Sequence, residues 1–143
     1  MTQYRDTQRA QFEIFKSLPR DTQINMLNLV QFFDRAEYPA DHTLAGESLT
    51  GAQAYAIYGA ASGPVLHRVG GTIIWRGGFE VSLIGDPSET WDTMFIAQYP
   101  NAGAFLAMVT DPEYQKAVAH RQAAVKNSRL IRSAPLPVSG TFQ

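Results

Sequence analysis

The stretch of residues 91–135 constrains the fold more than any other part of this 143-residue chain. Its first part, residues 93–99, is rich in aromatic and apolar residues and ends at Pro100, which cannot donate to a sheet ladder. Asp111, Pro112 and Glu113 then place an N-cap, a first-turn proline and an early acid in the order that a helix start requires. The stretch therefore predicts a strand, a short helix, a second helix with its own cap, and a final strand at about residue 129.

The residues before this stretch predict three further segments. Residues 6–17 read as a short helix that Leu18 and Pro19 end. Residues 23–33 predict a strand whose two faces are both largely apolar, so neither face is expected to lie open to water. Residues 34–50 form a long polar connection, and connections of this length are often functional or lie at an interface.

The middle of the chain predicts a helix followed by extended segments. Residues 50–69 show a helical apolar stripe, which we expect Gly63 and Pro64 to interrupt. Residues 72–76 and 79–84 are strand-like and are separated by two glycines. They predict either one long strand kinked at a bulge or a two-stranded hairpin.

This order of elements is a helix followed by βαββαβ, which predicts an α+β, ferredoxin-like domain with one antiparallel sheet and both helices on one face. We expect an N-terminal helical extension over residues 1–22, the domain over residues 23–135 and an extended tail over residues 136–143. No segment remains to cover the second, apolar face of the sheet. We therefore expect a homodimer that packs sheet against sheet.

Composition excludes several classes of function. The net charge of −1, with no cluster of Lys and Arg among aromatics, argues against nucleic-acid binding. The absence of cysteine removes disulfides, thiolate nucleophiles and cysteine metal sites, and it fits a reducing compartment. The N-terminus lacks a signal-peptide core, and no apolar run is long enough to span a bilayer. We expect a cytoplasmic protein with no membrane partner.

The sequence resembles the DUF1330 family of the dimeric α/β barrel superfamily over roughly residues 23–135. The matching segments are INMLNLV, VLHRVGG, the Trp75-Arg76-Gly77 strand, WDTMFIAQYP and DPEYQKAVAHRQAAVKNSRLI. The resemblance implies the ferredoxin-like fold and a homodimer. It implies no catalytic residues, because the family has no assigned function, while related branches include cofactor-free monooxygenases, isomerases and haem enzymes. The N-terminal helix and the connection over residues 34–50 are additions to the shortest members.

Two polar residues lie on faces that are otherwise apolar. Asn28 is inside the first strand. Its amide either makes a structural hydrogen bond within the protein or donates to an oxygen of a ligand. Arg121 falls on one helical stripe with Tyr114, Ala117, Val118 and Val125. We expect this stripe to face the sheet. Two roles are open for Arg121. Either its aliphatic stem packs on the sheet while the guanidinium reaches water or a carboxylate, or the guanidinium binds an anionic substrate.

Histidines and aromatic residues complete the candidates. His42 lies among acids in the long connection and is a candidate general base, whereas His67 and His120 are expected to be exposed. No metal site is predicted, because the spacing of the acids near His42 is irregular. Trp75 and Tyr99 are candidates to line a cavity for a flat ligand, and we find no haem, flavin or nicotinamide signature.

Three functions remain open from the sequence. The first is binding or conversion, without a cofactor, of a small apolar or anionic metabolite by Asn28, Trp75, Tyr99 and Arg121, with His42 closing from its loop. The second is a cofactor-independent, monooxygenase-like enzyme, by analogy with the superfamily. The third is a structural or interaction dimer without catalysis.

Overall fold

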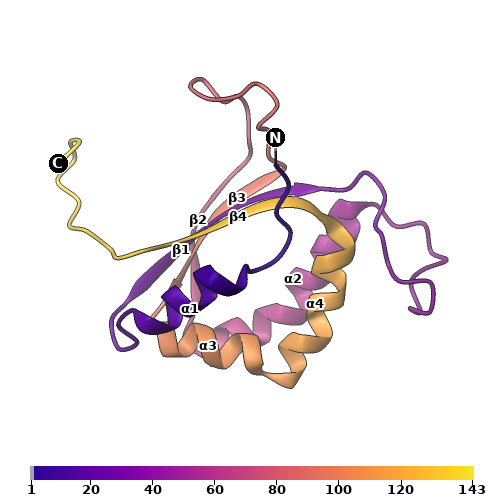
Figure 1. Cartoon of the computed structure of the whole chain (residues 1–143), viewed down its shortest axis with the longest axis horizontal. Coiled ribbons are helices and arrows are strands. Elements are labelled where there is room, and N and C mark those ends of the chain that lie inside the picture. Colours follow the sequence, from indigo (N-terminus) through magenta and orange to yellow (C-terminus); the bar gives the residue numbers. More distant parts are fainter. Residues whose placement is uncertain (1) are drawn as a thin grey trace.

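The computed structural model describes residues 2–143 as a four-stranded antiparallel sheet with helices packed on one of its faces (Figure 1). The elements in chain order are α1 (Arg9–Ser17), β1 (Ile24–Phe32), α2 (Gly51–Arg68), β2 (Thr72–Gly77), β3 (Thr93–Tyr99), α3 (Ala102–Thr110), α4 (Pro112–Ala124) and β4 (Val125–Ser133). None of the helices described is long and apolar enough to cross a membrane.

The strand order β2-β3-β1-β4 is that of a ferredoxin-like sheet, as the element order predicted. The crossover through α2 places β2 two positions from β1, and β3 fills the gap between them. The crossover through α3 and α4 places β4 on the other side of β1. The expected βαββαβ fold and the extra N-terminal helix α1 are therefore confirmed.

Side-chain caps set the helix boundaries. Thr50 and Gln53 form a reciprocal capping box at the start of α2, with hydrogen bonds of 2.8 and 3.1 Å. Asn101 caps α3 by accepting from the amide of Ala104 at 2.8 Å. Asp111 ends α3 and caps α4 through the amide of Glu113, so one residue divides the two helices at the predicted place.

The expected break of α2 at Gly63 and Pro64 is wrong, since the helix runs without interruption from Gly51 to Arg68. A residue before proline normally leaves the helical region because its Cβ clashes with the proline ring. Gly63 has no Cβ, so this clash is absent and the helix tolerates Pro64 at this position.

Two predicted strand boundaries are also corrected. Residues 79–84 form no strand and belong to an irregular loop that projects from the sheet (Figure 1). Within residues 2–143 this segment pairs with no strand, despite its alternating pattern. β4 begins at Val125 and not near Arg129, so Val125 is a buried strand residue paired with Phe32 and not part of a helical stripe.

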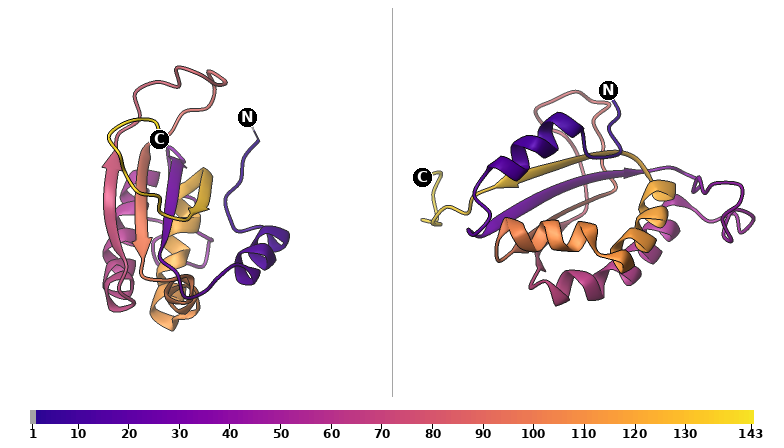
Figure 2. Two further views of the ribbon diagram at one scale, coloured as in Figure 1. Left: turned by 90° about the vertical axis from the view of Figure 1, so that its left-hand side faces the viewer. Right: turned by 60° about the horizontal axis from the view of Figure 1, so that its bottom comes forward.

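The helices leave the second face of the sheet uncovered. α2, α3 and α4 pack on one face around a core that includes Ile24, Met26, Val65 and Tyr99 (Figure 2). α1 lies at the β4 edge, where Arg132 donates to the carbonyls of α1 and the turn after it, and its Phe15 packs on Phe105 of α3 with ring centroids 5.0 Å apart (Figure 2). The register places the following side chains together on the uncovered face: Leu27, Leu29, Trp75, Met94, Ile96 and Ile131.

Candidate functional site

A cavity of about 900 Å³ lies between the covered face of the sheet, α2, α4 and the N-terminal segment, and we call it the main cavity. Its floor is apolar and aromatic, with Met26, Phe95, Tyr99, Phe105 and Met108. Three of the predicted ligand residues, Asn28, Tyr99 and Arg121, line it together. A pocket of this size with a few polar groups on apolar walls is the usual form of a small-molecule site.

Arg121 connects the main cavity to the N-terminal segment. Its guanidinium donates to the carbonyl of Arg5 at 2.7 Å and to Ser128 Oγ at 3.3 Å, and it lies 3.8 Å from the carboxylate of Asp6. Only 17% of its side chain is exposed. The position agrees with the predicted packing of its stem on the helix face, and the main partner is a backbone carbonyl.

A pair of tyrosines also faces the main cavity. The hydroxyls of Tyr58 on α2 and Tyr114 on α4 lie 2.8 Å apart, and Tyr114 falls on the apolar stripe that was predicted for its helix. Burial, then the charge and hydrogen bond of Tyr58, raise the pKa of Tyr114. Burial likewise raises the pKa of Tyr99, whose hydroxyl is directed at Met108 Sδ at 3.7 Å. These phenols therefore stay protonated at neutral pH and act as hydrogen-bond donors, not as bases.

Asn28 projects from β1 on the covered face. Its Nδ2 donates to the carbonyl of Met26 at 3.0 Å, which is a local hydrogen bond within its own strand. Within residues 2–143 its Oδ1 has no partner, so the amide offers the main cavity an acceptor oxygen as well as its second Nδ2 hydrogen.

The rim of the main cavity is cationic. Arg5, Arg121, Arg129 and Arg132 are among the residues that line it, together with Asp6, although the register places the Arg129 side chain beside Leu29 on the uncovered face. Each of these guanidiniums also donates to backbone carbonyls of the chain, which holds it in place. The cavity therefore combines an apolar floor with a fixed positive rim.

Trp75 and His42 lie away from the main cavity, contrary to the expectation that they share it with Asn28 and Arg121. Trp75 pairs with Ile96 on the uncovered face, where 45% of it is exposed. The cause is a bulge between Ile73 and Trp75, because one extra residue reverses the side-chain alternation of the strand.

His42 belongs to a small aromatic cluster on the outer side of α4. It stacks on Tyr38 with ring centroids 4.5 Å apart and meets His120 edge-on at 5.7 Å. The Tyr38 hydroxyl and His120 Nδ1 lie 2.7 Å apart, so His120 is half-buried and not exposed as expected. Burial first, and then the charge of His42, lower the pKa of His120.

The structure contains no group of three or more His, Cys, Asp or Glu side chains suited to a metal ion within residues 2–143. Tyr114 and the second pocket described below are the site features that sequence reasoning missed. For Tyr114 the signal was present, because it lies on the stripe already assigned to Arg121.

Fold and cavity together define a ferredoxin-like α+β protein with a small-molecule-sized space between sheet and helices. The chain belongs to the DUF1330 family, whose model, described as a domain of unknown function, matches residues 43–133. It is similar to the methylated RPA0582 protein, with 49% identity, a TM-score of 0.88, and coverage of 96% of this chain and 98% of that one.

A second crystal structure of RPA0582, a protein of unknown function from Rhodopseudomonas palustris, shows 48% identity and a TM-score of 0.87 over 96% of this chain and 100% of that one. SnoaB from Streptomyces nogalater, a cofactor-independent oxygenase, is 11% identical with a TM-score of 0.51 over 82% of this chain and 96% of that one, which shows the fold alone. No curated protein matches the chain.

Proposed function

We propose that the main cavity binds a small metabolite that has an apolar body and an anionic end. The observation that carries this proposal is the arrangement of Arg121, the hydroxyl pair of Tyr58 and Tyr114, and Asn28 around one cavity with an apolar floor. Tyr99 belongs to that floor, and the cationic rim favours an anion over a neutral compound.

The proposal is binding and not turnover. The buried phenols of Tyr99 and Tyr114 remain protonated, and His42, the candidate base, lies outside the main cavity. SnoaB, a cofactor-independent oxygenase, shares only the fold with this chain, and a shared fold alone does not support the same activity here.

The test compares two matched probes by fluorescence titration of the full chain. 1-Anilinonaphthalene-8-sulfonate is an aromatic anion, and N-phenyl-1-naphthylamine is its analogue without the sulfonate. We expect the anion to bind more tightly, and we expect Gly59→Leu, which introduces a side chain at the cavity wall, to reduce binding of both probes. Equal affinity for the two probes, or binding unaffected by Gly59→Leu, would contradict the proposal. If the probes bind as expected, native mass spectrometry of the purified protein would identify a retained metabolite.

We also propose that the chain forms a homodimer through the uncovered face of the sheet. In support, Ile131 is 50% and Trp75 45% exposed on a face whose neighbouring side chains are apolar. Single exposed apolar residues are ordinary on protein surfaces, but a contiguous patch marks an interface. Sheet-to-sheet packing by a second copy would cover the whole face.

A further inference from the structure

A second pocket, of about 480 Å³, lies between the first turns of α2 and the strands β2 and β3. It shares no lining residue with the main cavity. Its apolar wall consists of Ala52, Ala56 and the rings of Phe32 and Tyr55, whose centroids are 5.0 Å apart. Gly77 and Gly78 form the edge beside β2, so the pocket has room for a compact organic molecule.

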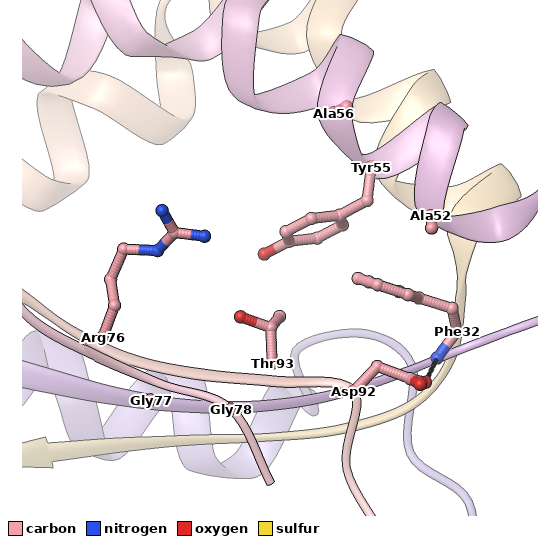
Figure 3. A pocket seen from close by; sticks show the side chains of 9 residues that line it. All are labelled: Phe32, Ala52, Tyr55, Ala56, Arg76, Gly77, Gly78, Asp92 and Thr93. Atoms are coloured by element: carbon pink, nitrogen blue, oxygen red, sulfur yellow. Dashed lines mark hydrogen bonds between the residues drawn. The ribbon is translucent and has the colours of Figure 1, made fainter.

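Three hydrogen-bond donors from three different elements face this pocket. Figure 3 shows the guanidinium of Arg76, the hydroxyl of Tyr55 and the hydroxyl of Thr93 directed toward the same space. Within residues 2–143, none of these three polar groups makes a hydrogen bond or an ion pair with another part of the chain. Burial raises the pKa of Tyr55, so its phenol remains a donor at neutral pH.

The backbone explains why Arg76 reaches this position. The extra residue between Ile73 and Trp75 shifts the alternation, so that Arg76 pairs with Phe95 on the covered face. Without that bulge the guanidinium would lie on the opposite face of the sheet.

The charges in the pocket favour a singly charged ligand over a doubly charged one. Asp92 also lines the pocket, and its Oδ2 accepts the backbone amide of Phe32 at 2.7 Å (Figure 3). This carboxylate offsets the charge of Arg76, so a doubly charged phosphate would meet repulsion that a carboxylate meets more weakly. A guanidinium flanked by hydroxyl donors also matches the planar, bidentate geometry of a carboxylate.

We propose that Arg76, Tyr55 and Thr93 bind the carboxylate of a small organic acid, whose apolar part lies against Phe32 and the alanines of α2. This site is separate from the main cavity and does not depend on what the main cavity binds.

Benzoate is the test ligand, with benzyl alcohol as the neutral analogue and inorganic phosphate as the competing anion. Titrations of the full chain are followed by calorimetry and by amide chemical shifts. We expect benzoate to bind most tightly and to shift the amides of Gly77, Gly78 and Thr93. Benzyl alcohol or phosphate binding as tightly as benzoate would overturn the proposal.

Variants separate the donors from the rest of the pocket. Arg76→Gln is expected to weaken benzoate binding by about 10- to 100-fold, because a charge-assisted hydrogen bond is lost. Tyr55→Phe keeps the ring and is expected to weaken binding by about 3- to 10-fold. Arg9→Gln changes an exposed arginine on α1 and serves as the matched control. Unchanged affinity in Arg76→Gln would refute the assignment, whereas Gly59→Leu should leave benzoate binding intact even where it blocks the main cavity.

Discussion

Replacing Gly59 by leucine is expected to stabilise the protein and to narrow the main cavity at the same time. Gly59 lies inside α2, lines the main cavity, and leaves open space where a Cβ would stand, since no atom comes within 4 Å of that position. A side chain is therefore accommodated without displacing a neighbour. The helix, moreover, gains a better helix former than glycine.

The magnitude follows from two terms. Glycine in a helix interior costs about 0.8–1.0 kcal/mol relative to alanine, so Gly59→Ala is expected to add about that much to the free energy of unfolding. Leucine has nearly the same propensity, and burying about half of its side chain against the cavity wall adds about 1 kcal/mol. A gain of about 1 kcal/mol raises the melting temperature of a chain of this size by about 2–4 °C.

Urea unfolding measures the stability of both variants, and titration with 1-anilinonaphthalene-8-sulfonate measures binding. Gly59→Ala is the matched control, because it improves the helix while filling little of the main cavity. We expect both variants to be more stable than the parent and only Gly59→Leu to bind the probe more weakly. A less stable Gly59→Ala would refute the reasoning about the helix. A Gly59→Leu protein that binds the probe as the parent does would refute the reasoning about the cavity.

Three further perturbations test other parts of the structure. Arg121→Met removes the hydrogen bond to the carbonyl of Arg5 and is expected to lower the free energy of unfolding by about 1–3 kcal/mol, and unchanged urea unfolding would refute this structural role of Arg121. Trp75→Glu places a charge on the uncovered face and is expected to convert the dimer into a monomer, which light scattering measures as a halved mass. A parent protein that is already monomeric at micromolar concentration would contradict the proposed dimer. Burial holds the pKa of His120 in the folded protein below its ordinary 6.5, so the unfolded chain takes up this proton first as the pH falls. The free energy of unfolding should therefore decrease from pH 6.5 down to the folded-state pKa and then level off. His120→Asn should flatten that part of the profile, and a loss confined to pH below 3.8 would point to carboxylates such as Asp111, whose pKa the Arg68 hydrogen bond lowers.

The parts of the fold that could be predicted depend on signals a few residues apart. Asp111, Pro112 and Glu113 start α4 as expected, because an N-cap hydrogen bond spans only two or three residues. The first strand was placed to within a residue at each end by its apolar run and the turn residues around it. Such signals act before any tertiary contact forms, so a single sequence contains them.

The candidate site was predicted less completely, because its contacts join distant residues. The hydrogen bond between Tyr38 and His120 spans 82 positions, and the bond from Arg121 to Arg5 spans 116. The acceptor in the second case is a backbone carbonyl, which every residue possesses, so no side-chain pattern could indicate it. The loop over residues 79–84 shows the converse, since its alternating pattern predicted a strand, yet the segment pairs with no other strand.

The bulge at Ile74 explains why the expectation that Trp75 lines the main cavity was wrong. Strict alternation from Ile73 puts Trp75 on the covered face and Arg76 on the uncovered one. The inserted residue exchanges them, so that the indole joins the apolar face proposed for the dimer and the guanidinium enters the second pocket. The Trp75 ring then lies over Gly77, where a Cβ would come within 2.7 Å of it, so a larger residue at this position would displace the ring. One backbone irregularity thus supplies an apolar residue to one face and a cation to the other, and side-chain alternation alone cannot predict it.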